Sequence, residues 1–210
     1  MLIVGAKGFA KEVLEILYQN EYKKDIVFYD DVNIDVCGKL YGKYKILKNE
    51  IEVKDFFLKN GPEFTIGIGG PVLRNELYNR FSNLGGDFTS VISLKSDIGH
   101  FNSSIGKGCI ITSGVIVTND VKINNGSIVN LNSTIGHDTI IGRFVEICPN
   151  ANISGRCIIN DMVFIGTSAT VLPDIKIEKN SIIGAGSVVT KDVPDNVLVV
   201  GVPAKIVKYL

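Results

Sequence analysis

Several residue types that carry common chemistries are scarce in this chain of 210 residues. It has two histidines, four cysteines and no tryptophan. No two cysteines stand in a CxxC pair, the spacing typical of redox and zinc motifs. Isolated thiols of cytosolic proteins are commonly buried as small apolar residues. We therefore assign no chemistry to the four cysteines, which are Cys37, Cys109, Cys148 and Cys157.

The chain also lacks an excess of charge of either sign. Lys+Arg and Asp+Glu number 22 each, so the formal net charge is zero. No basic stripe interleaved with aromatics is present, which argues against nucleic acid as a partner. No apolar run approaches the roughly 18 residues of a membrane span. Glu12 and Glu15 interrupt the segment where a secretory signal needs an apolar core. We expect a cytoplasmic protein without membrane insertion.

The most informative feature that is present is a six-residue repeat. Hydrophobic residues make up 45% of the chain, enough for one large domain or two small ones. Fifteen aliphatic residues follow one another at every sixth position from Ile105 to Val189. The residue four places after each, from Cys109 to Val193, is small or β-branched.

This period is neither that of a helix nor that of a single strand. A helix returns apolar residues after three and four positions, and a half-buried strand alternates strictly. A triangular solenoid explains the repeat: each hexad forms one flat side, and three hexads close a coil. The fifteen hexads predict five coils stacked about 4.8 Å apart. Ile92 and Ile98 predict a partial first coil with a one-residue bulge, and the chain is expected to leave the coil after Val193-Pro194.

Residues 1–88 carry no hexads and predict alternating strands and helices. Strands are expected at 2–4, 26–29 and 64–68, and helices at about 9–17, 50–59 and 71–82, with an irregular stretch after the second strand. This order is typical of a small Rossmann-like unit with a parallel sheet. We therefore predict two domains, an α/β domain over 1–88 and an all-β helix over 89–210.

The loop Gly5-Ala6-Lys7-Gly8-Phe9-Ala10 lies between the first predicted strand and helix. Free amides and the helix dipole at such a place favour a phosphate. The loop lacks the third glycine of GxGxxG, so a tight turn without a ligand is the alternative. Asp30, at the end of the next strand, can accept hydrogen bonds from a ribose or a base.

The hexads resemble those of the hexapeptide-repeat acyltransferases. The pattern of an aliphatic residue, glycine, two variable residues and a small residue recurs as IGKGCI, IGHDTI, IGTSAT and IIGAGSVV, over roughly residues 92–205. The resemblance implies a left-handed coil and a homotrimer. The spacing alone does not give the handedness.

With the domain order, the chain resembles the NeuD/PglD-type sugar O- and N-acyltransferases. The matching segments are GAKGFAKE, Asp30-Asp31, IGIGGPVLR, Asn130, His137-Asp138 and the terminal GVPAK. The resemblance implies a nucleotide-linked sugar held by Gly5, Lys7, Gly8, Phe9, Asp30, Asp31, Gly69, Arg74 and Asn130. It implies acetyl-CoA as co-substrate, contacted by Glu146, Gly166, Gly184, Ala185, Pro203, Ala204 and Lys205. Some relatives carry a histidine at the place of Glu146.

His137 is the candidate catalytic base on physical grounds as well. An outward position of a hexad has no packing reason to be histidine, and the Asp138 carboxylate can fix its tautomer and stabilise the imidazolium. Neighbouring side chains of a strand point to opposite faces, so the pair requires a bend, which the third and fourth hexad places provide. A surface histidine in a polar loop is the alternative. His100 lacks such a neighbour and is expected either to be structural or to support the site without contacting the substrate.

Zinc catalysis is the natural rival on this fold, because γ-class carbonic anhydrases use three histidines around zinc. Only two histidines exist here, 37 residues apart, so we predict no metal.

The sequence thus predicts an acetyl-CoA-dependent N-acetyltransferase of a nucleotide-linked amino sugar, serving bacterial lipopolysaccharide, capsule or glycoprotein glycan biosynthesis. O-acetylation of a sialic acid or another glycan sugar is one alternative. A non-catalytic nucleotide-sugar-binding or scaffold protein is the other. Exposed aliphatics such as Ile110, Ile140 and Ile158 are expected to form the contact between subunits.

Overall fold

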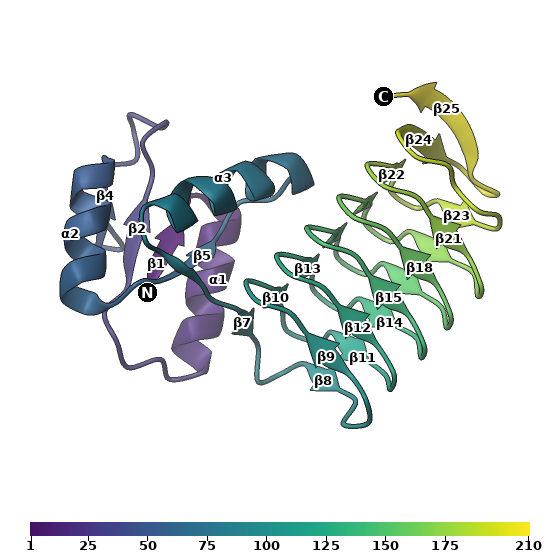
Figure 1. Ribbon diagram of the computed structural model, residues 1–210, viewed down its shortest axis with the longest axis horizontal. Coiled ribbons are helices and arrows are strands. Elements are labelled where there is room, and N and C mark those ends of the chain that lie inside the picture. The colour runs from purple at the N-terminus through teal and green to yellow at the C-terminus, as the bar shows by residue number, and fades with distance from the viewer.

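The computed structural model describes residues 1–210 as an α/β unit followed by a three-sided parallel β-helix (Figure 1). The α/β unit lies beside the first coils, and the last coils project away from it (Figure 1). None of its helices is both long and apolar enough to span a bilayer.

The α/β unit is built on a mostly parallel sheet with strand order β3-β4-β2-β1-β5-β6. Its strands are β1 (Leu2–Val4), β2 (Val27–Tyr29), β3 (Lys39–Leu40), β4 (Tyr44–Leu47), β5 (Glu63–Ile66) and β6 (Asp87–Phe88). Buried residues of α1 (Gly8–Gln19) share a core cluster with Ile3 and Phe28. Buried residues of α2 (Glu50–Asn60) and α3 (Pro71–Asn83) share another with Leu2 and Val4. The helices thus cover both faces, as in the predicted Rossmann-like fold.

The stretch predicted to be irregular contains a hairpin instead. Strand β3 pairs antiparallel with β4, and β4 joins the sheet parallel to β2. The pattern gave little signal because β3 has only two residues and Lys39 and Lys45 face each other across the hairpin. The predicted strand at 64–68 ends at Ile66, which leaves Gly67 to Gly70 as a turn at the end of the sheet.

The β-helix has three faces built from two-residue strands. The first face contains β7 (Val91–Ile92), β10 (Ile110–Ile111), β13 (Ile128–Val129), β16 (Glu146–Ile147), β19 (Phe164–Ile165) and β22 (Ile182–Ile183). The second contains β8 (Asp97–Ile98), β11 (Ile116–Val117), β14 (Thr134–Ile135), β17 (Asn152–Ile153), β20 (Thr170–Val171) and β23 (Val188–Val189). The third contains β9 (Ser104–Ile105), β12 (Lys122–Ile123), β15 (Ile140–Ile141), β18 (Ile158–Ile159) and β21 (Lys176–Ile177).

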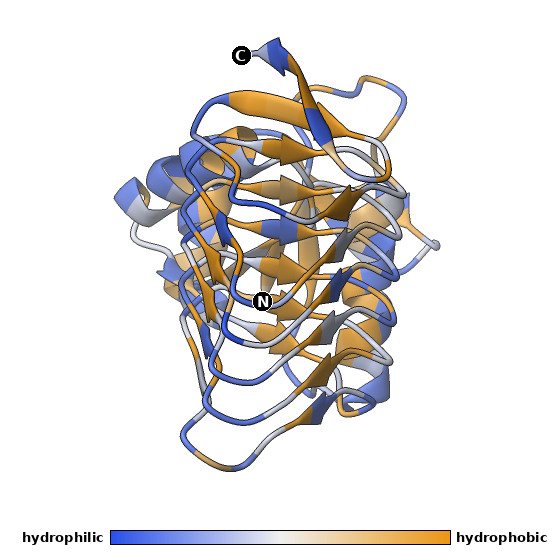
Figure 2. Cartoon of the chain, turned by 90° about the vertical axis from the view of Figure 1, so that its right-hand side faces the viewer, coloured by the Kyte–Doolittle hydropathy of each residue, from blue (hydrophilic) through white to orange (hydrophobic).

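The repeated aliphatic residues fill the axis of this helix, as predicted. The axial core is a cluster of 26 buried residues that includes both the aliphatic and the small hexad positions. Hydrophobic residues concentrate in the stacked strands, and polar residues concentrate in the corner loops (Figure 2). The first coil is also confirmed, because Ile98 pairs with Val117 and Ile105 with Ile123. These registers place the extra residue in the corner between Ile98 and Ile105.

The predicted exit from the coil after Val193-Pro194 is wrong. Val193 still bridges to Ile177, and β24 (Val197–Val200) pairs parallel with β22. Only then does β25 (Lys205–Tyr209) fold back antiparallel on β24. The six-residue period breaks at Asp195, but Val197 and Val199 remain buried and extend the apolar axis.

The α/β unit packs on the first face of the β-helix. The outward residues Val91, Ile110 and Ile128 lie in one core cluster with residues of α1 and β1. The prediction that Ile110 is exposed is therefore wrong, since its partner surface belongs to the same chain. Ile140 and Ile158, on the third face, remain 40% and 39% exposed.

Candidate functional site

His137 lies in the corner between β14 and β15, where the second face turns into the third. Its Nδ1 is 2.7 Å from Oδ2 of Asp138, and both side chains are 55% exposed. Asp138 has a left-handed backbone, with φ of 59°, which breaks the alternation of side chains along a strand. The corner thus brings the two predicted catalytic residues together.

The geometry of this pair defines what the imidazole can do. A carboxylate accepts only, so the hydrogen bond assigns the proton of the neutral ring to Nδ1. Nε2 is then the unprotonated nitrogen and can take a proton from a reacting group. Asp138 holds the ring in this tautomer and stabilises the imidazolium once it forms.

Sequence reasoning missed the residues of the next coils that flank His137. A Cβ on Gly155 would lie 2.7 Å from Nε2, so glycine keeps this side of the ring open. One coil further, Asp174 accepts two hydrogen bonds from Arg156, at 2.6 and 2.8 Å. These hydrogen bonds lower the pKa of Asp174 and raise that of Arg156. The only signal in the sequence was a glycine one coil, 18 residues, after His137.

A crevice of about 310 Å³ opens where β1, β2 and β5 end and α1 begins. Six of the predicted substrate residues line it, namely Gly5, Lys7, Gly8, Phe9, Asp30 and Gly69. Lys7 is the N-cap of α1 and caps no amide with its side chain, so the first amides of the helix face the crevice region without a side-chain acceptor. Such an end favours an anion.

Asp30 lines the crevice, and its contact with the ligand stays a prediction. Only 6% of it is exposed. Its carboxylate accepts hydrogen bonds from the amide of Asn33 at 2.8 Å and from the Asn33 side chain at 2.9 and 3.0 Å. Lys48, which the sequence did not single out, donates to the carbonyl oxygens of Asp30 and Asn33. Asp30 therefore shapes the wall of the crevice, and its carboxylate is occupied within its own loop.

A slot of about 200 Å³ adjoins this crevice and shares Gly5, Asp30, Asn33 and Ile68 with it. Asp31 lies in the slot and accepts hydrogen bonds from Tyr29 and Arg80, both at 2.9 Å. Burial and the hydrogen bond to Asp31 raise the pKa of Tyr29 to about 12, so the phenol keeps its proton. Polar groups beside apolar side chains suit a flat heterocycle such as a nucleobase.

Arg74 lines neither cavity, and its contact with the substrate stays a prediction. It is fully buried and donates to the carbonyl oxygens of Ile66, Ile68 and Gly126. Burial lowers the pKa of its guanidinium to about 10, and the charge of Glu146 opposes this shift. It joins the α/β unit to the β-helix.

Asn130 and Glu146 lie away from His137 in the same chain. Asn130 follows β13 in the corner between the first and second faces, and its Oδ1 accepts from the amide of Leu131 at 2.8 Å. Oε2 of Glu146 accepts from the amide of Gly70 at 2.6 Å. The carboxylate of Glu146 is thus turned toward the α/β unit.

The remaining predicted contacts of acetyl-CoA gather near the end of the coil. Gly166, Gly184 and Ala185 share one corner, and a Cβ on Gly166 would lie 2.6 Å from the amide of Ala185. The connection from β24 to β25 carries Pro203 and Ala204, and the amide of Ala204 donates to Val188. Lys205 begins β25.

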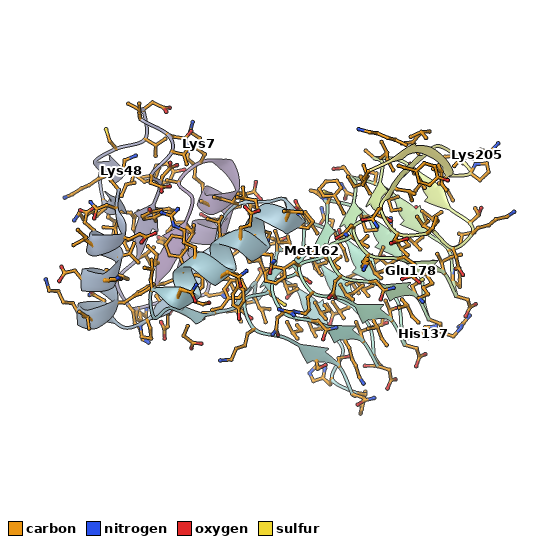
Figure 3. The ribbon with its side chains drawn as sticks, turned by 45° about the horizontal axis from the view of Figure 1, so that its top comes forward. Lys7, Lys48, His137, Met162, Glu178 and Lys205 are labelled. Carbon is orange, nitrogen blue, oxygen red and sulfur yellow. The ribbon has the colours of Figure 1, made fainter.

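These three regions are separate within one chain. Figure 3 shows Lys7 on the α/β unit, His137 on a corner of the β-helix and Lys205 at its far end. No group of three or more His, Cys, Asp or Glu side chains is placed to hold a metal ion. The fold and the His–Asp pair are those of a hexapeptide-repeat acyltransferase.

Comparisons with known proteins agree with this class. Residues 1–81 match the PglD N-terminal domain, and residues 156–191 match the bacterial transferase hexapeptide repeats. GDP-perosamine N-acetyltransferase of Escherichia coli O157:H7 is 30% identical over 98% of this chain and 95% of its own length. A tetrahydropyridine-dicarboxylate N-acetyltransferase of Clostridium perfringens is 56% identical, but the match spans only 22% of that protein.

Solved structures resemble the whole chain. The acetyltransferase domain of PglB from Neisseria gonorrhoeae superposes with a TM-score of 0.89 at 26% identity and covers 98% of both chains. PerB from Caulobacter crescentus, in complex with CoA and GDP-perosamine, gives 0.87 at 26% identity and covers 98% of this chain and 95% of its own.

The chain belongs to the NeuD/PglD-type sugar O- and N-acyltransferase family. The predicted family and fold class are confirmed. The same domain of PglB has also been solved in complex with acetyl coenzyme A and has a TM-score of 0.88 to this chain.

Proposed function

We propose that the protein transfers the acetyl group of acetyl-CoA to the amino group of a nucleotide-linked amino sugar, in the cytoplasm and in the service of bacterial glycan synthesis. The observation that carries this proposal is the presence, in one chain, of a His–Asp pair at 2.7 Å and a crevice at the start of a helix. The relatives that match the full chain include an N-acetyltransferase of GDP-perosamine.

The crevice holds the nucleotide in this proposal. The amides of Gly8 and its neighbours, at the positive end of the α1 dipole, bind the diphosphate. Asp31 and Arg80, in the adjoining slot, supply an acceptor and a donor for the base or the ribose. Binding energy at these groups orients the sugar, although they lie far from the reacting nitrogen.

His137 acts as the general base. Nε2 removes a proton as the sugar amine attacks the thioester carbonyl of acetyl-CoA. The new C–N bond forms, the C–S bond breaks, and the coenzyme A thiolate leaves and takes up the proton from the imidazolium. Asp138 stabilises the imidazolium between these two steps. General base catalysis of this kind contributes about 10²- to 10⁴-fold in rate.

A homotrimer completes the site in this proposal. The separation of His137 from the crevice in one chain supports a site made of the crevice of one subunit and His137 of another. Ile140 and Ile158 on the third face, together with Ile116 on the second, offer partly exposed apolar surface to a neighbouring copy.

O-acetylation is the second candidate. A galactoside O-acetyltransferase of Lactococcus lactis is 46% identical over 27% of this chain. That match covers 27% of the relative.

The test is acetyl transfer to a panel of UDP-, GDP- and dTDP-linked amino sugars, compared with the free amino sugars and with hydroxyl-only analogues. We expect release of the coenzyme A thiol and an N-acetylated product with at least one nucleotide-linked amino sugar. Equal turnover of the free sugar contradicts the role of the crevice, and turnover of hydroxyl analogues alone favours O-acetylation.

A further inference from the structure

The turn from Gly67 to Gly70 forms one wall of the crevice and is held by two charged side chains that do not line it. Gly67, Ile68 and Gly69 line the cavity. Arg74 reaches the turn from α3, and Glu146 reaches it from β16 of the β-helix. The guanidinium of Arg74 donates hydrogen bonds to backbone carbonyl oxygens, and the carboxylate of Glu146 accepts a hydrogen bond from a backbone amide.

Arg74 binds carbonyl oxygens on both sides of the boundary. Nη1 donates to Ile66 at 2.6 Å and to Ile68 at 2.9 Å, at the start of the turn. Nε and Nη2 donate to the carbonyl of Gly126 in the β-helix at 3.2 and 3.1 Å. The planar fork of a guanidinium spans these acceptors, whereas a lysine ammonium does not. The side chain is fully buried, so a shift of the turn would leave desolvated donors without partners.

Glu146 binds the other end of the turn. Oε2 accepts from the amide of Gly70, the N-cap residue of α3, at 2.6 Å. Oε1 lies so close to Gly69 that a Cβ there would be 2.9 Å away. A carboxylate at the start of a helix is favoured by the helix dipole, and this one also attracts the charge of Arg74. The β-helix thereby supplies the anion that α3 lacks in its own first turn.

We propose that Arg74 and Glu146 are positioning residues that fix the wall of the nucleotide crevice on the β-helix. The proposal rests on the proposed function, because it assigns the two residues to the alignment of the bound nucleotide sugar. Loss of either leaves the crevice residues unchanged but lets the turn, and with it the sugar, move relative to the base. A misplacement of about 1 Å costs up to about a hundredfold in rate. Glu146 then serves the acceptor rather than the acetyl group that the sequence assigned to it.

The experiment uses Glu146→Ala and Glu146→Gln in the full-length protein, with Glu76→Gln as the matched control. Glu76 is an exposed carboxylate on the same helix α3 with no partner. Because Glu146 is only partly buried, we expect its variants to fold. For Glu146→Ala we expect kcat/KM for the nucleotide amino sugar to fall by about tenfold or more, with the KM for acetyl-CoA unchanged within about twofold. Glu146→Gln, which keeps an acceptor oxygen, should recover part of this loss, and Glu76→Gln should match the wild type.

A second readout is hydrogen exchange at the amide of Gly70. We expect this amide to exchange about tenfold faster in Glu146→Ala than in the wild type, because the carboxylate no longer accepts its hydrogen. Arg74→Lys should lower kcat/KM for the same substrate, and its effect should not add to that of Glu146→Ala if both residues fix one turn.

In an enzyme that acetylates a nucleotide amino sugar, two results overturn the proposal. A higher KM for acetyl-CoA in Glu146→Ala, with the nucleotide sugar unaffected, places Glu146 at the acetyl group instead. Lower thermal stability with unchanged kcat/KM makes the contact structural only. If the wild type acetylates no nucleotide amino sugar, the proposed function has failed. The fixing of the turn by Glu146 is then judged by hydrogen exchange alone, and an unchanged exchange rate of the Gly70 amide in Glu146→Ala overturns it.

Discussion

At the scale of single residues, the chemistry depends on His137 and its neighbour. The ring is held by a 2.7 Å contact to Asp138 and is open on the side of Gly155. We expect His137→Ala to lower kcat by about a hundredfold or more, because it removes the base while the corner keeps its backbone contacts. Steady-state acetyl transfer measures this effect, and thermal unfolding checks that the fold is retained.

The matched control is His100→Ala. His100 is exposed in the corresponding corner of the first coil and has no carboxylate beside it. It should retain activity within a few-fold of the wild type. If His137→Ala also retains activity within a few-fold, direct base catalysis by this residue is wrong.

The cysteines allow a second test at the residue scale. Cys37 is exposed and the other three are buried. Burial raises the pKa of Cys109 to about 11 and that of Cys148 to about 12, so their thiolate fraction at pH 8 is smaller than that of a free thiol. Because the thiolate is the nucleophile, iodoacetamide should label Cys37 first. Labelling at pH 8 followed by peptide mass spectrometry gives the order in which the cysteines react. Labelling of Cys148 as fast as that of Cys37 in the folded protein would contradict the burial of Cys148.

At the scale of elements, the loop from Gly5 to Ala10 is either part of a nucleotide-binding site or only a tight turn, and a substitution in it can tell the two apart. A Cβ on Gly8 meets nothing within 4 Å, and this residue has no left-handed backbone. Gly8→Val therefore leaves the fold intact and narrows the space for a diphosphate. We expect the KM for the nucleotide sugar to rise by about tenfold or more, with the KM for acetyl-CoA nearly unchanged. Calorimetry with UDP, GDP and dTDP compares the nucleotide affinities of the wild type and Gly8→Val without a need for turnover.

Asp30→Ala is a less specific probe of the same crevice. Its carboxylate holds the Asp30 to Asn33 loop, so the substitution changes the wall as well as the ligand contacts. Gly8→Val is therefore the decisive variant: if it leaves nucleotide binding unchanged, the loop from Gly5 to Ala10 is only a tight turn.

The elements differ in how much of them the sequence could predict. The hexads predicted the β-helix because a single six-residue period places every inward side chain, and all of these side chains pack along one axis. Strands β3, β4 and β24 were missed: the short hairpin of β3 and β4 belongs to no repeat, and β24 follows a break in the period at Asp195. The covering of Ile110 was missed because the hexad pattern shows which side chains point outward, but not what packs on them.

The same limit applies to the site. Motif neighbours such as His137 and Asp138 could be paired from the sequence, because a bend brings adjacent residues together. Arg74 contacts Gly126 across 52 positions, and Glu146 contacts Gly70 across 76. Only the docking of the α/β unit on the first face brings these groups into contact, so their roles could not be read from the motifs.

At the scale of the whole molecule, the α/β unit and the β-helix share their cores. Val91, Ile110 and Ile128 lie in a cluster with α1, and Phe144 stacks on Phe88 with ring centroids 6.4 Å apart. Removal of residues 1–88 would expose these apolar side chains, and the shortened chain would be prone to aggregate. The role of the α/β unit is therefore tested best by point variants in the intact chain.

The central claim is that the crevice of one subunit and His137 of another serve one reaction. Complementation between two defective chains tests this claim most directly. Gly8→Val and His137→Ala chains are co-expressed with different affinity tags, and mixed assemblies are isolated and assayed at nucleotide amino sugar concentrations below the KM of Gly8→Val. Each chain alone should be nearly inactive under these conditions. In a mixed trimer, which holds two copies of one chain and one of the other, one of the three sites between neighbouring subunits pairs an intact crevice with an intact His137, so about a third of the sites are complete. We predict that the mixed assemblies recover activity toward this fraction of the wild-type value, and mixed assemblies as inactive as either parent would contradict the account.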